Sequence, residues 1–118
     1  HGIVQSAIGL WNELPRLMGR PPSQITARLD ETPALARYAV YLAASDPGVK
    51  ELLLNYASQW QNIMPTINGH DLQRLGLRPG PYYRTILSTL RNAWLDGMVN
   101  TLEEERALLD QLLTDLAV

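Results

Sequence analysis

The sequence predicts an all-α fold, a compact bundle of about seven short helices. Apolar residues recur at helical spacing, several helix starts carry an N-cap residue followed by proline, and no stretch alternates as a half-buried strand would. The chain has 118 residues, a length that fits one domain with one hydrophobic core. We therefore expect residues 1–118 to form a single helical domain.

The first half of the chain contains four expected helices, at residues 3–18, 22–31, 33–45 and 46–63. The first stops at the glycine and prolines of residues 19–22, although Pro15 blurs its end. Thr32-Pro33 and Asp46-Pro47 each read as an N-cap and a first helical residue. The apolar stripes that support the last two helices are Leu35, Tyr38, Ala39 and Leu42, then Val49, Leu52, Leu53, Tyr56 and Trp60.

The second half contains three expected helices, at residues 69–75, 81–96 and 101–116. Asn68 with Asp71 and Thr101 with Glu104 have the spacing of capping boxes, the first being the weaker signature. Glycine or proline lies at the boundaries, at Gly76, Gly80-Pro81 and Asp96-Gly97. The apolar stripes are Ile86, Leu87, Leu90, Ala93 and Trp94, then Leu102, Leu109, Leu112, Leu113 and Leu116.

Composition narrows the class of protein. There is no cysteine, so disulfides, thiolate metal sites and cysteine nucleophiles are excluded, and a reducing compartment such as the cytoplasm is expected. No apolar run is long enough to span a membrane, and the first residues lack the basic-then-apolar pattern of a signal peptide, so we expect neither a secreted nor a membrane-bound protein. The start at His1-Gly2, inside helical sequence, suggests an expression scar before a piece of a longer protein.

The net charge of −2 hides an uneven distribution. Residues 1–68 balance, whereas residues 69–95 hold four arginines against one aspartate, and residues 96–118 hold six acidic residues against one arginine. A basic segment is therefore followed by an acidic helix, and the basic segment is where an anionic partner would bind.

The sequence contains no motif that indicates a catalytic or metal-binding site. The chain has two histidines, too few for a metal site, and His70 beside a helix start reads more readily as a surface residue than as a catalyst. The run of residues 103–105 reads as acidic residues in a first helical turn, where the helix dipole favours them. We expect no catalytic residue, no metal ligand and no cofactor in this chain.

The most informative stretch is residues 67–81, INGHDLQRLGLRPGP, in which a short helix stops at glycine and a tight turn starts a longer one. It resembles a helix-hairpin-helix with its turn near residues 75–81. Such a turn directs free backbone N–H groups at the start of a helix toward an anion. The expected donors are the amides of Tyr82, Tyr83 and Arg84; Pro81 has no N–H to lose, and Gly80 allows close approach.

A polar stripe continues along the longer helix. Arg84, Ser88 and Arg91 follow one another at i, i+4 and i+7, on the side away from Leu87, Leu90 and Trp94. This spacing fits a phosphate track, and it equally fits an exposed helix face with an ordinary glycine-proline turn. Spacing alone leaves both interpretations open.

Residues 67–105 as a whole resemble the C-terminal helical region of bacterial tRNA nucleotidyltransferases and related poly(A) polymerases. The resemblance rests on NGHDL, LGLRPGP, the helix containing AWLDG and then VNTLEEE, in that order and spacing. It covers about a third of the chain; residues 1–66 match only in being helical. Just after Pro-Gly-Pro the chain departs from the small or aliphatic residues of the family and has Tyr82-Tyr83-Arg84.

The resemblance implies a tRNA-binding module from a longer enzyme. In that family an N-terminal head, absent here, holds Mg²⁺ and adds nucleotides, while the helical body and tail grip tRNA by its shape and phosphates, as double-helical RNA requires. A tyrosine after the turn could stack on a nucleotide, although its spacing favours packing. Carried over by position, the RNA-binding residues are Gly69, His70, Arg74, Arg78, Gly80, Pro81, Tyr82, Arg84 and Arg91.

Two other functions are compatible with the sequence. A structural or oligomerisation domain, including a homodimer, would use the leucine-rich last helix and the tryptophans at 11, 60 and 94 to contact the parent enzyme or a second copy. A DNA-repair helix-hairpin-helix would share the turn but would not predict AWLDG followed by EEE. The absent head would decide whether the parent enzyme adds CCA, part of CCA or poly(A).

Overall fold

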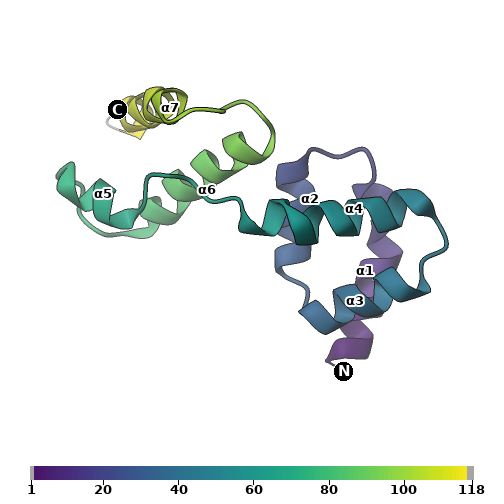
Figure 1. The fold of residues 1–118 in the computed structure, drawn as a ribbon. Coiled ribbons are helices and arrows are strands. Elements are labelled where there is room, and N and C mark those ends of the chain that lie inside the picture. Colours follow the sequence, from purple (N-terminus) through teal and green to yellow (C-terminus); the bar gives the residue numbers. More distant parts are fainter. Residues whose placement is uncertain (1, 117–118) are drawn as a thin grey trace. The chain divides into compact units, whose positions relative to one another are not determined.

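The computed structural model describes residues 2–116 and shows them as helices and connecting segments without a strand (Figure 1). The predicted all-α class is confirmed. His1, and with it the expression-scar interpretation, lies outside the described residues. The elements in chain order are α1 (Ile3–Leu17), α2 (Pro22–Asp30), α3 (Ala34–Ala43), α4 (Pro47–Ser58), the 3-10 helix η1 (Trp60–Asn62), α5 (Gly69–Arg74), α6 (Pro81–Leu95) and α7 (Leu102–Leu116).

The largest difference from the predicted boundaries is at α4. The helix ends at Ser58 instead of residue 63, Gln59 leaves the helical region at φ −131°, and η1 follows. The Ser58 hydroxyl donates to the carbonyl oxygen of Leu54 at 2.7 Å, a back-bond that bends and weakens helices. The apolar stripe continued past this point, so the sequence pattern could not show the break.

Most of the predicted helix starts are confirmed. Asp46 caps α4, with its carboxylate accepting from the Gly48 amide at 2.8 Å. Asn68 and Asp71 form a complete capping box at α5, with N···O distances of 2.9 and 3.0 Å. The prediction that Thr32 caps α3 was wrong, because α3 begins one residue later than expected. The buried Thr32 side chain instead accepts a hydrogen bond from Arg28 Nη1, at 2.7 Å.

The chain divides into two compact units, unit 1 at residues 1–62 and unit 2 at residues 63–118. Within residues 2–116, two hydrophobic clusters therefore take the place of the single core that we expected, and the assignment of 1–118 to one domain stays a prediction. None of the helices in residues 2–116 is long and apolar enough to cross a membrane. The buried clusters are Leu10, Leu14, Ile25, Leu29, Val40, Leu52, Leu53 and Tyr56 in unit 1, and Ile67, Leu72, Ile86, Leu90 and Leu109 in unit 2.

Candidate nucleic-acid interface

The turn between α5 and α6 is built as the helix-hairpin-helix pattern predicts. Gly76, at φ +91°, ends α5 in the left-handed region that glycine adopts without strain. The Leu77 amide donates to the Leu72 carbonyl at 3.2 Å and the Gly76 amide to the Gln73 carbonyl at 3.0 Å. These two bonds form a Schellman motif, which satisfies the end of α5 and directs the chain toward α6.

The start of α6 leaves backbone donors available. Gly80 is the N-cap and supplies no side chain to cap the helix, and Pro81 has no N–H. The Tyr83 amide, which we expected to be free, donates to the Gly80 carbonyl at 3.0 Å. Among the described residues, the amides of Tyr82 and Arg84 have no such partner. Two of the three predicted amides therefore remain at the positive end of the helix dipole, where an anion is favoured.

The two tyrosines after the turn pack against it. Both hydroxyls donate to loop carbonyls, Tyr82 to that of Arg78 and Tyr83 to that of Leu77 at 2.5 Å. The rings meet edge to face with centroids 5.4 Å apart, and burial, followed by the neighbouring Tyr82, raises the pKa of the Tyr83 phenol. A Cβ on Gly69 would lie 3.6 Å from the Tyr83 ring. The tyrosines thus close the hairpin, and the assignment of Tyr82 to RNA binding stays a prediction.

The four predicted arginines differ in what they contact. Arg78 and Arg84 are exposed, and their guanidinium groups make no ion pair or hydrogen bond within the described residues. Arg74 is exposed but forms an ion pair with Asp71 at 3.2 Å. Arg91 is half-buried, and its Nε donates to the Ile63 carbonyl at 2.9 Å. Arg78 and Arg84 are therefore the cations best placed to meet a phosphate.

Further along α6, the predicted apolar stripe forms the buried face, but it is not covered throughout. Ile86, Leu90 and Ala93 are buried, while Leu87 and Trp94 are only partly covered. The polar stripe predicted at Arg84, Ser88 and Arg91 is exposed at its first two residues. At Arg91 it is not, because this side chain is half-buried and donates to the Ile63 carbonyl.

The remaining predicted contacts lie beside the hairpin. Gly69 is the first residue of α5 and is half-buried, and the exposed His70 follows it. Gly80 is half-buried, with a would-be Cβ 3.0 Å from the Tyr82 ring, and Pro81 is exposed at the start of α6. The φ of −178° at Gly80 is open to any residue, so a larger residue here would meet the Tyr82 ring, which would have to shift by a few tenths of an ångström.

Glu105 is a key residue that the sequence analysis missed. The sequence analysis grouped it with Glu103 and Glu104 as acidic residues that the helix dipole favours in a first turn, yet its side chain is completely buried. Its carboxylate accepts three N–H donors: the Thr66 and Ile67 amides, each at 2.8 Å, and Trp94 Nε1. The segment leading into α5, the end of α6 and the start of α7 thus meet at one acidic group. The only sequence signal was that Glu105 follows the capping residue Glu104.

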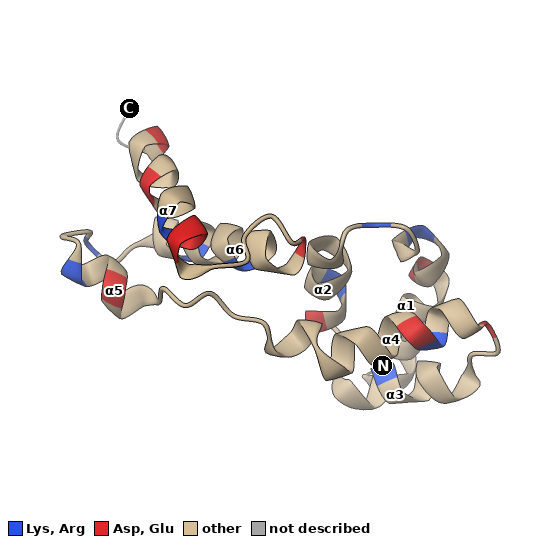
Figure 2. Cartoon of the chain, turned by 45° about the horizontal axis from the view of Figure 1, so that its top comes forward, with Lys and Arg blue, Asp and Glu red and all other residues tan. Residues whose placement is uncertain are grey.

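The α7 side of unit 2 offers little to an anion. Figure 2 shows acidic residues along α7, where Glu103, Glu104, Asp110 and Asp115 are exposed. A groove of about 580 Å³ between α5 and α7 has a rim of two arginines and two aspartates, and its charges balance. Apart from Arg106, which is exposed on α7 beside this groove, the exposed arginines of unit 2 that form no ion pair within the described residues are Arg78 and Arg84 on the hairpin side. Residues 2–116 hold no group of three or more His, Cys, Asp or Glu side chains placed to bind a metal ion.

Comparison with known proteins gives one relationship. The chain is 34% identical over 74 residues to an A-adding tRNA nucleotidyltransferase of Geobacter sulfurreducens. The match covers 63% of this chain and 8% of that relative, so the chain spans a small part of the relative's length. No family model and no solved structure matches. The match supports a relationship at the level of the tRNA nucleotidyltransferases.

Proposed function

We propose that the chain is the tRNA-binding C-terminal region of a cytoplasmic tRNA nucleotidyltransferase, CCA-adding or A-adding, or of a related poly(A) polymerase. It grips tRNA by shape and by phosphate contacts. A catalytic head elsewhere in the parent enzyme binds Mg²⁺ and adds the nucleotides. The relationship to the A-adding enzyme supports the parent's class.

The observation that carries the RNA-binding role is the start of α6. Two unpartnered amides, those of Tyr82 and Arg84, lie at the positive end of a 15-residue helix. Arg78 precedes them in the turn and Arg84 follows in the first turn of the helix, with both side chains exposed. Amides and guanidinium groups at one helix start suit a phosphate and read no base, which fits recognition of double-helical RNA by its backbone.

A salt-titrated binding assay with tRNA and with duplex DNA tests this proposal. The wild-type chain should prefer tRNA, and its affinity should fall as salt rises, because each neutralised phosphate releases counterions. Replacing Arg78→Ala together with Arg84→Ala should weaken binding and lower the slope of log K against log salt by about 2, because two phosphates are no longer neutralised by an arginine.

The matched control removes two exposed arginines from unit 1, Arg16→Ala with Arg20→Ala. It changes the net charge by the same amount but leaves α6 intact. If the control reduces binding as much as the α6 variant does, the attraction is unspecific. If the folded chain does not bind tRNA at low salt, the role proposed here is wrong.

An oligomerisation role is the second candidate, and the exposed side of α1 favours it. Val4, Ile8 and Trp11 recur at i, i+4 and i+7 and are 65%, 51% and 47% exposed. Trp11 is the most exposed of the three tryptophans. Trp60 packs against the unit 1 cluster, and the Trp94 indole donates a hydrogen bond to Glu105. Sedimentation of the wild type and of Trp11→Ser distinguishes a dimer from a monomer; a monomer in both removes the homodimer from consideration.

A further inference from the structure

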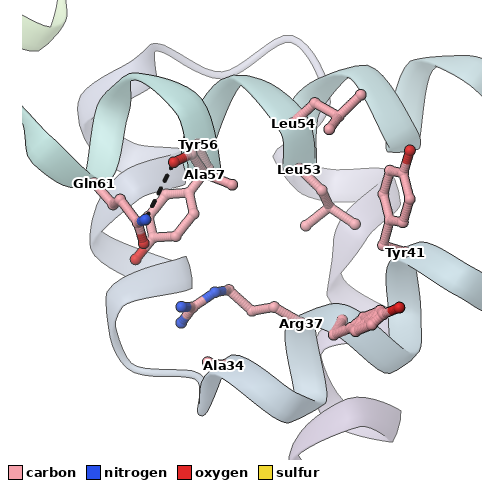
Figure 3. Close-up of a pocket in the computed structure, with 9 residues that line it drawn as sticks. Ala34, Arg37, Tyr41, Leu53, Leu54, Tyr56, Ala57 and Gln61 are labelled. Carbon is pink, nitrogen blue, oxygen red and sulfur yellow. Dashed lines mark hydrogen bonds between the residues drawn. The ribbon is translucent and has the colours of Figure 1, made fainter.

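Unit 1 contains a cavity of about 340 Å³ between α3 and α4 that the proposed tRNA grip does not use (Figure 3). Its volume is within the range of small-molecule sites, at the lower end. Three tyrosines, at positions 38, 41 and 56, contribute to its wall with the aliphatic side chains of Leu53 and Leu54. Such a cavity suits a flat ring, because aromatic walls stack on ring faces.

One charged side chain, Arg37, lines the cavity, and its position is fixed. Its Nη1 donates to the carbonyls of Leu29, at 3.1 Å, and of Thr32, near the end of α2. Its guanidinium carbon also lies 4.9 Å from the centroid of the Tyr56 ring. Figure 3 shows the guanidinium extending from α3 toward Gln61 and Tyr56. Nε and Nη2 make no hydrogen bond with described residues, so two nitrogens of a fixed cation, with three N–H groups, remain for an anion.

The three tyrosines of the cavity differ in whether the hydroxyl group already has a hydrogen-bond partner. Tyr56 is buried and its hydroxyl donates to Asp30 at 2.7 Å, so it offers the cavity its ring alone. Tyr38 is 54% exposed, and the hydroxyls of Tyr38 and Tyr41 have no partner within the described residues. The Lys50 ammonium lies over the Tyr41 ring, 4.3 Å from its centroid, and donates to the Tyr41 carbonyl, so it holds Tyr41 in place without lining the cavity.

We propose that this cavity binds a nucleotide, with the base between Tyr38 and Tyr41 over Leu53 and the phosphate on Arg37. Ring faces, hydroxyls for the edge of a base and a fixed guanidinium are the groups that bind unpaired nucleotides. The ligand comes either from a free mononucleotide or from an unpaired nucleotide of an RNA. This site goes beyond the tRNA grip, which uses residues of unit 2.

Titration of the 118-residue chain with adenosine monophosphate, followed by amide NMR shifts, tests the site. Saturable binding is expected, with shifts at residues of α3 and α4. Adenosine, which lacks the phosphate, should bind more weakly, as should 4-hydroxyphenylacetate, which has a ring and an anion but no base edge. A tetra-adenylate oligonucleotide that binds more tightly than the monophosphate would identify RNA as the source, and a weaker one would identify the free nucleotide.

Two variants on α3 form a matched pair. Tyr38→Ala should lower the affinity for adenosine monophosphate about tenfold, the loss expected for one stacked base. Leu35→Ala, 68% exposed on the same helix and outside the cavity lining, should leave the affinity unchanged. No saturable binding at millimolar concentration, equal binding of 4-hydroxyphenylacetate, or equal losses in both variants would overturn the proposal. Because tRNA binding is tested at Arg78 and Arg84, either proposal can fail while the other stands.

Discussion

Three cations of unit 1 have partners within their own unit, whereas two arginines of unit 2 have none within the described residues. In unit 1, Arg28 forms an ion pair with Glu13 at 2.7 Å, Arg37 donates to two carbonyls, and Lys50 donates to the Tyr41 carbonyl at 2.7 Å. In unit 2, by contrast, Arg78 and Arg84 project from the hairpin without such partners. Cations that satisfy their own fold stabilise it, whereas exposed and unpaired ones remain available to a polyanion.

The units also differ in how they hold their helices together. Unit 1 relies on an apolar cluster in which Leu10 and Leu29 are completely buried. Unit 2 has a smaller apolar cluster and adds the buried Glu105, with its three N–H partners. The hairpin that carries the candidate interface therefore depends on a polar junction, and that junction is the place to test the comparison.

The largest effect is expected from Glu105→Ala. The change leaves the Thr66 and Ile67 amides and the Trp94 indole N–H without their acceptor, at a cost of about 4 kcal/mol in the free energy of unfolding of unit 2. Amide hydrogen exchange can follow the two units separately, and unit 1 should be unchanged. Glu103→Ala, an exposed neighbour in the same turn, is the control and should have little effect. Equal effects of the two substitutions would show that the junction does not support unit 2.

The next largest effect is expected from Leu29→Ala, which creates a cavity in the core of unit 1. The loss should be about 3 kcal/mol, measured by urea unfolding, and hydrogen exchange should place it in unit 1. Binding of tRNA should persist under conditions in which unit 2 remains folded. If exchange rises equally throughout both units, the chain unfolds as one cooperative domain, as the sequence predicted.

Gly76→Ala should have a smaller effect. The residue has φ +91° and no atom within 4 Å of a would-be Cβ, so the cost is backbone strain alone, about 1 kcal/mol. Thermal unfolding measures it. A matched Gly9→Ala, inside α1 with the nearest atom 3.8 Å away, should be neutral or stabilising, because alanine favours helix. Equal losses at the two sites would argue against the left-handed turn.

The smallest effect is expected from Glu13→Gln, which removes the ion pair with Arg28. The hydrogen bond from Arg28 lowers the pKa of Glu13 below its ordinary value of 4.5. The pair therefore stabilises unit 1 above that pH, and this stabilisation disappears as the pH falls through the lowered pKa. Unfolding curves of the two proteins should differ slightly at pH 7 and converge at acidic pH; a difference that grows toward acidic pH would contradict this assignment.

Local signals made much of the candidate interface predictable. Three helix-boundary signals depend only on neighbouring residues, and the structure contains all three: the Asn68–Asp71 capping box, the helix end at Gly76 and the helix start at Gly80-Pro81. Which arginines remain available could not be predicted in this way. Arg84 and Arg91 lie on the same predicted polar stripe of the helix, yet Arg91 donates to a carbonyl 28 residues earlier in the chain.

The sequence by itself determined the helical class, most of the helix boundaries and the geometry of the hairpin, because capping, proline and glycine effects are short-range. The tertiary structure decided which charged groups are buried and which are free. Glu105 looked like its two acidic neighbours until the fold brought to it the Thr66 amide, 39 residues away, and the Trp94 indole. Arg37 likewise became the fixed cation of a cavity only when α3 packed beside the end of α2 and α4. Such roles depend on partners distant in sequence, and no local pattern encodes them.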